Sequence, residues 1–177
     1  MFDIRKIQEQ VIFNTIKAES NETMAKKVVF VENEDNPTWV KNTMKRLEEN
    51  FDPSMVKKIR MKCQCGYAMD EKLALVKDLM AKAKNLDEFA NNEKARNAGL
   101  SFENNTLYLQ FRFCPCPMVA DVNKLETKTW CQCTTGYSKV LFEKAFGCEV
   151  DVELLKSIKM GDDICLMKII PLGEFKF

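Results

Sequence analysis

The sequence predicts an α+β fold, in which a mostly helical N-terminal half packs on a C-terminal antiparallel sheet with one intervening helix. Up to residue 99, apolar residues recur at the spacing of amphipathic helices. Beyond residue 100 the pattern changes to the alternation of half-buried strands. The chain has 177 residues, of which 46% are hydrophobic and 30% are charged, as in an ordinary globular domain. We therefore predict one α+β domain over residues 1–177, mostly helical over 1–99, with a hairpin, a Cys-rich loop, a helix and a C-terminal hairpin over 100–177.

Helical spacing and capping residues predict the elements of the first part. Residues 4–18 place isoleucine and valine along one face of a helix. Residues 24–31 are compatible with a helix capped by Ser20 or Asn21, but also with a strand. Asn36-Pro37 and Asp52-Pro53 each combine an N-capping side chain with proline at the first helical position. These two pairs predict helices that start at Pro37 and Pro53, and the second is expected to run into Cys63.

Two further helices are predicted over 70–83 and 87–97, with Gly99 as the terminator because glycine tolerates a left-handed cap. Residues 106–113 alternate between apolar and polar side chains and predict a strand, entered through a turn at Asn104-Asn105.

The last third is predicted to contain one helix and a hairpin. Thr134 or Thr135 is a candidate cap for a helix over 137–146, and Gly147 is its expected stop. The two alternating segments that follow are joined by Met160-Gly161-Asp162-Asp163, which supplies the turn residues of a hairpin.

Bulk charge and hydropathy exclude several classes of partner. Lys+Arg (27) and Asp+Glu (26) nearly cancel, so no strong field attracts nucleic acid or an anionic membrane. We find neither a secretory signal at the start nor an apolar run long enough to span a bilayer. The expected location is the cytoplasm. The expected partner is a small molecule rather than a nucleic acid or a membrane, and the oligomeric state is left open.

The cysteines carry the chemical information. A reducing cytoplasm disfavours disulfides among the eight cysteines and favours metal ligation, redox chemistry or burial. Histidine is absent, so a soft-metal site has to use sulfur, with carboxylate or solvent as supplements. Six cysteines form three Cys-x-Cys pairs, namely Cys63/Cys65, Cys114/Cys116 and Cys131/Cys133.

Cysteines at positions i and i+2 of an extended segment project from the same side and can hold one ion together. Two such pairs make a tetrahedral sulfur site, which suits zinc or an iron–sulfur cluster. Glycine, proline and threonine beside the pairs favour rigid loops whose N–H groups point at sulfur. The alternative is that the cysteines are small buried side chains. Six thiolates exceed the four of a mononuclear site, and Cys63/Cys65 would be left out first because it is farthest in sequence. Core packing is the expected role of Cys148 and Cys165.

The segment from Trp130 to Ile169 carries a resemblance. It contains Trp-Cys-Gln-Cys-Thr-Thr-Gly-Tyr before a helix that ends at Gly147, and a Gly-Asp turn before a strand with Cys165. This pattern resembles the C-terminal half of the vinyl-reductase-type small-molecule-binding domain and the aminothiazoline-carboxylate-hydrolase-like proteins of anaerobes. The resemblance covers about the last third of the chain. It implies an α+β fold with a pocket for a small or apolar ligand, and it matches Cys131 or Cys133 and Cys165 to family cysteines. The doubled cysteine at the helix start and the added Cys114-Pro115-Cys116 depart from the family pattern.

Three functions follow from these observations. The first is a cysteine-ligated zinc or iron–sulfur protein that acts as a small-molecule sensor or ligand-binding module. The second is a metal-dependent amidohydrolase with a carboxylate base, and the third is a dithiol/disulfide redox protein. Whether the protein is an enzyme is left open. The candidate pocket residues are Phe111, Phe113, Phe142 and Phe146, which are also typical of a core, and the candidate bases are Glu126, Glu143, Asp162 and Asp163.

Overall fold

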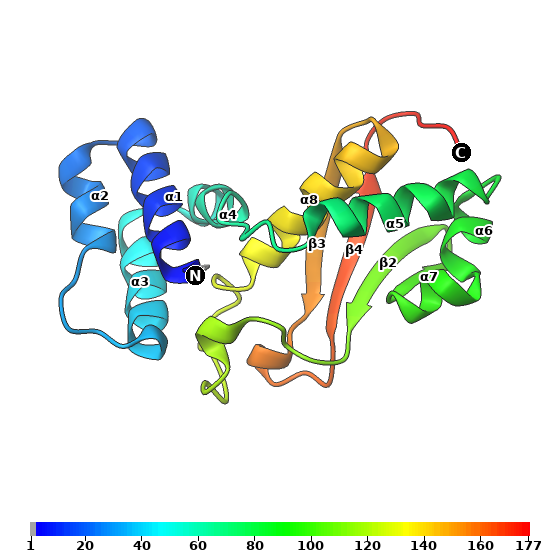
Figure 1. The fold of residues 1–177 in the computed structure, drawn as a ribbon. Helices are drawn as coiled ribbons and strands as arrows, with labels where there is room; N and C mark the ends of the chain where they lie inside the picture. The colour runs from blue at the N-terminus through cyan, green and yellow to red at the C-terminus, as the bar shows by residue number, and fades with distance from the viewer. Residues whose placement is uncertain (1–2) are drawn as a thin grey trace. The chain divides into compact units, whose positions relative to one another are not determined.

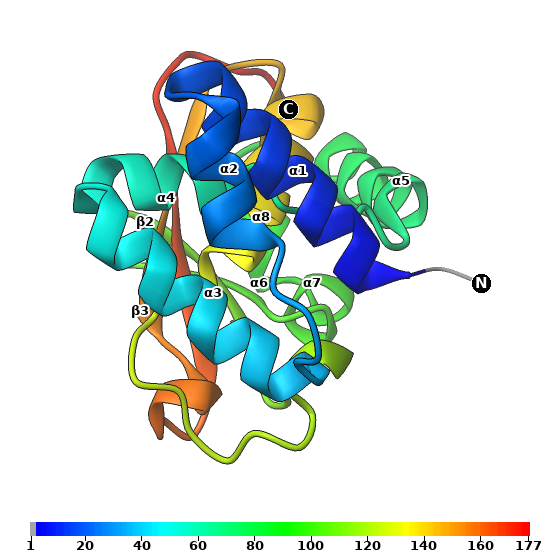
Figure 2. The same ribbon diagram turned by 90° about the vertical axis from the view of Figure 1, so that its left-hand side faces the viewer.

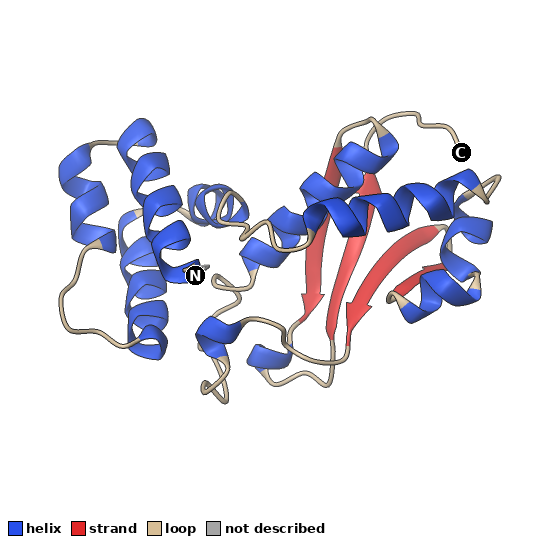
Figure 3. Ribbon diagram, viewed as in Figure 1, coloured by secondary structure: helices blue, strands red, loops and turns tan. Residues whose placement is uncertain are grey.

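The computed structural model describes residues 3–177 and divides the chain into two compact units (Figure 1). The helical unit comprises Met1–Cys65 and Cys114–Gly136, and the sheet unit comprises Gly66–Phe113 and Tyr137–Phe177. Figure 3 shows the strands of the described chain gathered in the sheet unit. The predicted α+β class is confirmed, with most helices in the first half and an antiparallel sheet late in the chain. The single domain over 1–177 stays a prediction.

The helical unit is built from four α-helices, a short 3-10 helix and the first turn of a fifth α-helix. These are α1 (Ile4–Glu19), α2 (Glu22–Val29), α3 (Asn36–Asn50), α4 (Pro53–Met61), η1 (Pro117–Val119) and the start of α8 (Gln132–Phe146). The ambiguous segment after Asn21 is helical, and the Asn21 side chain caps it by accepting from the N–H of Met24. The core includes Trp39 and Trp130, whose rings pack edge to face with centroids 6.1 Å apart.

Two boundaries in the helical unit differ from prediction. Helix α3 is capped by Asp35 rather than Asn36, because the Asp35 carboxylate accepts from the N–H of Thr38 at 2.8 Å. Helix α4 starts at Pro53 as predicted but ends at Met61, before Cys63. The chain closes this helix with a tighter turn, in which the N–H of Cys63 donates to the carbonyl of Arg60 at 3.1 Å.

The sheet unit has four strands in the order β1-β2-β4-β3, all antiparallel. Its elements are α5 (Met69–Ala81), α6 (Leu86–Asn91), α7 (Glu93–Asn97), β1 (Leu100–Glu103), β2 (Thr106–Phe111), the rest of α8, β3 (Val150–Lys156), η2 (Ile158–Met160) and β4 (Cys165–Pro171). Figures 1 and 2 show α5 and α8 on the same side of this sheet. The alternating residues predicted to face inward, such as Leu107, Val152 and Ile169, are buried.

Turn residues behave as predicted in the sheet unit. Asn104 and Asn105 both have positive φ, at 49° and 59°, and connect β1 to β2. Gly99 and Gly147 adopt left-handed conformations after α7 and α8, at φ 93° and 70°. Gly161 does the same, at φ 99°, in the connection between β3 and β4.

Three predicted boundaries in this part of the chain are wrong. The helix over 87–97 is two helices, because Asn92 leaves the helical conformation and caps α7 by accepting from the N–H of Ala95 at 2.9 Å. Strand β2 ends at Phe111, where its partner β4 begins at Cys165. Helix α8 begins at Gln132, so Thr134 and Thr135 lie inside its first turns rather than at its cap.

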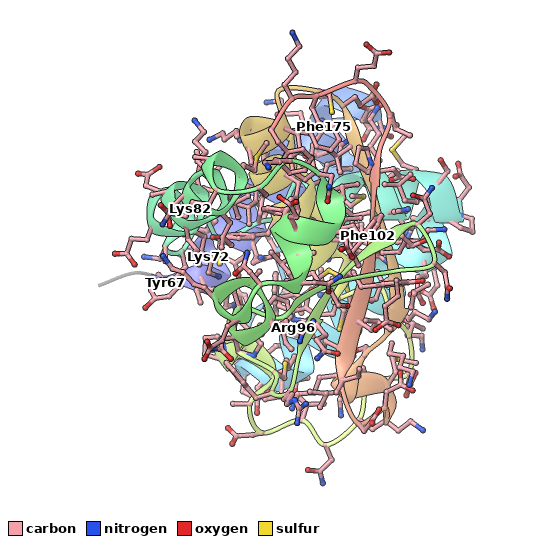
Figure 4. All side chains as sticks on the ribbon, turned by 90° about the vertical axis from the view of Figure 1, so that its right-hand side faces the viewer. Tyr67, Lys72, Lys82, Arg96, Phe102 and Phe175 are labelled. Atoms are coloured by element: carbon pink, nitrogen blue, oxygen red, sulfur yellow. The ribbon has the colours of Figure 1, made fainter. Side chains whose placement is uncertain are left out.

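Tyr137 joins α8 to the beginning of α5. Its hydroxyl donates to the carbonyl of Tyr67 at 2.8 Å, and the ammonium group of Lys72 lies 4.8 Å from the centre of its ring. Figure 4 shows Tyr67 and Lys72 close together at this end of α5. The contact holds the segment after Cys65 against α8.

Candidate functional site

The three Cys-x-Cys pairs lie in the helical unit, each at the end of a regular element. Cys63 and Cys65 follow α4, Cys114 and Cys116 precede η1, and Cys131 and Cys133 lie at the start of α8. None of the eight cysteines takes part in a disulfide in the described chain. Within residues 3–177, no group of three or more His, Cys, Asp or Glu side chains is close enough to hold a metal ion as the side chains lie. The predicted metal ligands therefore stay predictions, and the contacts around the sulfurs are the evidence that bears on them.

Several cysteines of the helical unit act on the pKa of the Cys133 thiol. Desolvation by the surrounding protein raises its pKa to about 12, and the neighbouring thiols of Cys116, Cys131 and Cys63 act in the same direction. The Arg60 guanidinium opposes this shift. These four thiols come from three separate stretches of chain, so folding brings together sulfurs that are far apart in sequence.

Cys116 has N–H groups around its sulfur. Desolvation raises the pKa of this thiol, whereas the indole N–H of Trp130 and the backbone N–H groups of Met118 and Val119 lower it. The nearby thiol of Cys114 raises it further. N–H groups that point at sulfur are typical of metal-bound cysteines, because they stabilise the thiolate. The Trp130 indole nitrogen is fully buried and lacks a hydrogen-bond partner of acceptable geometry among the described residues.

Cys63 and Cys65 differ in environment. Cys63 is fully buried, and its thiol donates to the carbonyl of Ile59 at 3.2 Å. Burial raises the pKa of Cys63, and the charge of Arg60 opposes this. Cys65 is half-buried. Distance in sequence favoured leaving this pair out, but the fold brings the segment that leads to Cys63 against the first turn of α8, which carries Cys133, through the contact of Gly136 with Met61.

Arg60 is a central residue that sequence reasoning missed. Its side chain is fully buried, and its guanidinium lies 4.3 Å from the centre of the Trp130 ring. It donates to the Gln8 side-chain oxygen at 2.6 Å and to the carbonyls of Trp130 and Thr129 at 2.8 and 3.3 Å. The Gln8 amide in turn donates to the carbonyl of Cys63. A signal was present in the sequence, because Arg60 occupies the apolar face of its helix, four residues after Val56 and three before Cys63.

Gly136 allows α8 to begin close to the end of α4. A Cβ atom at this position would overlap the carbonyl oxygen of Met61 and lie 2.7 Å from the Met61 Cα atom. Only a residue without a side chain permits this approach. The contact fixes the first turn of α8, which carries Cys131 and Cys133, next to the segment that leads to Cys63.

Comparison with known proteins adds a family assignment. The model of a family of unknown function, DUF6144, matches residues 1–176. The chain belongs to this family. No curated protein and no solved structure matches it significantly. The match includes residues of both the helical and the sheet unit.

The remaining cysteines lie in the sheet unit. The sulfur of Cys165 accepts from the N–H of Ile158 at 3.5 Å, and the Cβ atom of Cys148 lies close to Gly173. Both side chains are half-buried, so packing at the edge of the unit describes them better than burial in the core.

The predicted catalytic bases have other contacts or are exposed. Glu143 forms an ion pair with Lys139 at 2.8 Å, and Asp162 accepts from the N–H of Ser157 at 2.8 Å. Asp163 lies 3.8 Å from the Lys156 ammonium group. These three belong to the sheet unit, whereas Glu126 is an exposed residue of the helical unit.

The phenylalanines proposed to line a pocket separate into two groups. Phe142 and Phe146 are buried and pack on each other with ring centroids 5.4 Å apart. Phe89 and Phe175 extend this aromatic cluster through contacts with Phe146. Phe113, by contrast, is 66% exposed.

Within the described chain, no helix is both long enough and apolar enough to cross a membrane.

Proposed function

We propose that this protein binds a metal ion or a metal cluster through cysteine thiolates of its helical unit. The observation that carries the proposal is that all three Cys-x-Cys pairs belong to one compact unit, in which the first turn of α8 packs on Met61 beside the segment of Cys63. The thiols of Cys63, Cys116 and Cys131 also act on the pKa of Cys133. Four thiolates are the complement that zinc requires for a tetrahedral site and that iron–sulfur clusters use. The donor set therefore fits either cofactor.

The surroundings of the sulfurs support ligation over simple burial. Cys131 and Cys133 lie at the start of a 15-residue helix, whose N-terminal partial charge favours thiolates. The N–H groups of Met118 and Val119 do the same at Cys116. A cluster of thiols used only as apolar packing would need neither feature. The absence of histidine leaves sulfur as the soft donor in this chain.

The raised pKa values argue against the redox alternative. A redox-active cysteine reacts as the thiolate and usually has a lowered pKa. Burial raises the pKa of Cys63, Cys116 and Cys133 instead. Metal ligation displaces the thiol protons directly, so it does not require a lowered pKa in the metal-free protein.

A role as a small-molecule sensor or ligand-binding module in the cytoplasm accompanies this proposal. Its support is the resemblance of the last third of the chain to small-molecule-binding domains. A sensor of this kind would bind its ligand reversibly, and ligand binding would be expected to change the spectrum or the affinity of the metal site.

The test is metal analysis of protein purified without oxygen, combined with matched cysteine variants. We expect stoichiometric zinc in a colourless protein or stoichiometric iron and sulfide in a coloured one. Cys133→Ser should lose most of the metal, because it removes one of the proposed thiolate ligands at the start of α8. Cys148→Ser is the control, since it removes a half-buried thiol from the sheet unit. A folded wild-type protein that retains no metal and binds none on titration would refute the proposal.

A further inference from the structure

Arg60 is a buried cation without an anionic partner among the described residues. Its side chain is fully buried, and its guanidinium donates to the Gln8 amide oxygen and to the carbonyls of Thr129 and Trp130. All three acceptors are neutral. None of the ion pairs formed among residues 3–177 includes Arg60. Arg46 in the same unit shows the usual arrangement, with Glu34 at 3.4 Å.

A buried charge is costly unless an opposite charge lies nearby. Neutral carbonyls satisfy the hydrogen bonds of a guanidinium group but leave its net charge in place. The contacts of Arg60 place it beside two cysteine segments, because it donates to the carbonyl of Trp130, which precedes Cys131, and to Gln8, whose amide donates to the carbonyl of Cys63. Thiolates of these segments are groups that can carry the opposite charge. A divalent ion held by four thiolates has a net charge of minus two, so a site of this kind supplies the missing anion.

We infer that Arg60 is a positioning residue that supplies the internal counter-charge of a dianionic site formed by four thiolates of the Cys-x-Cys pairs. This inference rests on the proposed metal-binding function and adds the charge of the occupied site and the residue that balances it.

The contacts of Arg60 explain why arginine suits this position. The planar guanidinium group donates in several directions at once. It joins Gln8 of α1 to the carbonyls of Thr129 and Trp130, which directly precede Cys131. Gln8 continues this network to the carbonyl of Cys63. One side chain therefore connects two of the three cysteine segments while it places a positive charge beside them.

Trp130 supplies an independent observation that points to the same site. It is only 2% exposed, and its indole N–H lacks a hydrogen-bond partner of acceptable geometry in the part of the chain that the structure describes. An unpaired buried donor is costly. The same indole favours the charged form of Cys116, so a metal-bound thiolate there would provide the acceptor.

The experiment uses the full chain, stripped of metal under reducing conditions and titrated with Co²⁺, whose bonds to thiolate absorb in the near ultraviolet. Wild type is compared with Arg60→Lys, which keeps the charge, and with Arg60→Gln, which keeps hydrogen-bond donors but removes the charge. Arg46→Gln is the matched control, because it removes a positive charge from the same unit at a residue that already has a carboxylate partner.

We expect Arg60→Gln to weaken Co²⁺ binding by about tenfold or more, as for a charged hydrogen-bonding partner lost from a buried site. Its sulfur-to-cobalt absorption should shift to longer wavelength, because a nearby cation lowers the energy of the sulfur electrons. Arg60→Lys should stay within about threefold of wild type and keep the band position. Arg46→Gln should leave both quantities unchanged. The band position distinguishes a charge effect from a loss of structure.

Two outcomes would overturn the inference while the metal-binding function stands. One is a folded Arg60→Gln variant with wild-type affinity and absorption, and the other is an equal loss in Arg60→Lys and Arg60→Gln. Should Arg60→Gln fail to fold, Arg60→Lys decides, since a tenfold loss in that variant contradicts a role of the charge. Failure of the wild-type protein to bind Co²⁺ or Zn²⁺ would instead refute the proposed function itself.

Discussion

Replacement of Gly136 by alanine tests how closely α8 must approach α4. At an ordinary helical position, glycine to alanine stabilises a protein by about 1 kcal/mol, because alanine has the higher helix propensity. At Gly136 the new methyl group would lie 2.7 Å from the Met61 Cα atom, whereas ordinary contacts are 3.4–4 Å, and it would overlap the Met61 carbonyl oxygen. The two backbones must therefore separate by about 1 Å to admit it.

The expected result is a net destabilisation. Overpacking costs about 1–3 kcal/mol, and a clash between two backbones belongs at the upper end of this range. After subtraction of the helix-propensity gain, Gly136→Ala should lower the free energy of unfolding by about 2 kcal/mol. The same displacement moves Cys131 and Cys133 away from Cys63, so the affinity of the proposed metal site should fall as well. Urea unfolding of the metal-free and metal-loaded protein measures both effects.

Gly147→Ala is the control, because it adds the same methyl group at the other end of α8. Nothing lies within 4 Å of a Cβ atom there, and φ is +70°. Gly147→Ala should lower the free energy of unfolding by about 1–2 kcal/mol, the cost of holding alanine in the left-handed conformation, and should leave the affinity of the proposed metal site unchanged. A Gly136→Ala protein that is more stable than wild type, or that binds metal normally, would refute the packing argument.

Three further predictions concern other parts of the chain. Hydrogen bonds from Lys26 and Lys17 lower the pKa of Glu22 to about 2. The ionised Glu22 carboxylate should therefore stabilise the fold fully above pH 4.5, and this stabilisation should be lost as the pH falls towards 2. The Tm difference between wild type and Glu22→Gln should disappear over that range. Asp52→Ala removes a cap that accepts from two backbone N–H groups and should cost about 1 kcal/mol in urea unfolding. Phe175→Ala removes a ring that stacks on Phe146, with ring centroids 4.3 Å apart, and should lower the free energy of unfolding by about 1 kcal/mol or more.

Each of these predictions has an outcome that would contradict it. A Tm difference for Glu22→Gln that persists at pH 2 would mean that its ion pairs are not responsible. Asp52→Ala should leave unfolding unchanged if the cap is dispensable. Phe113→Ala, at a residue that is 66% exposed, is the control for Phe175→Ala, and equal effects of the two would show that the stacking contributes little.

Local chemistry in the sequence was sufficient for most elements. The proline and aspartate that begin α4, the paired asparagines at 104 and 105, and the alternating residues of β2 and β3 act within a few residues of one another. Caps, turns and periodicity are properties of such short segments. The α+β class could therefore be predicted from the sequence.

Boundaries were missed where a distant contact decides them. Strand β2 ends at Phe111 because its partner strand begins opposite at Cys165, more than 50 residues later. Helix α8 starts at Gln132, before the threonines that were the best local candidates for its cap. Its first turn packs against Met61, through a glycine whose importance no local rule indicates.

By itself the sequence determined the kind of ligand this protein can offer, because a chain with six cysteines in close pairs and no histidine can present soft donors only as sulfur. Only the tertiary structure decided which sulfurs are neighbours and what surrounds them. The thiol of Cys63 acts on the pKa of Cys133, and the charge of the fully buried Arg60 acts on both thiols. The physical reason is that proximity and desolvation depend on how distant helices pack, and neither is encoded in the spacing of residues along one segment.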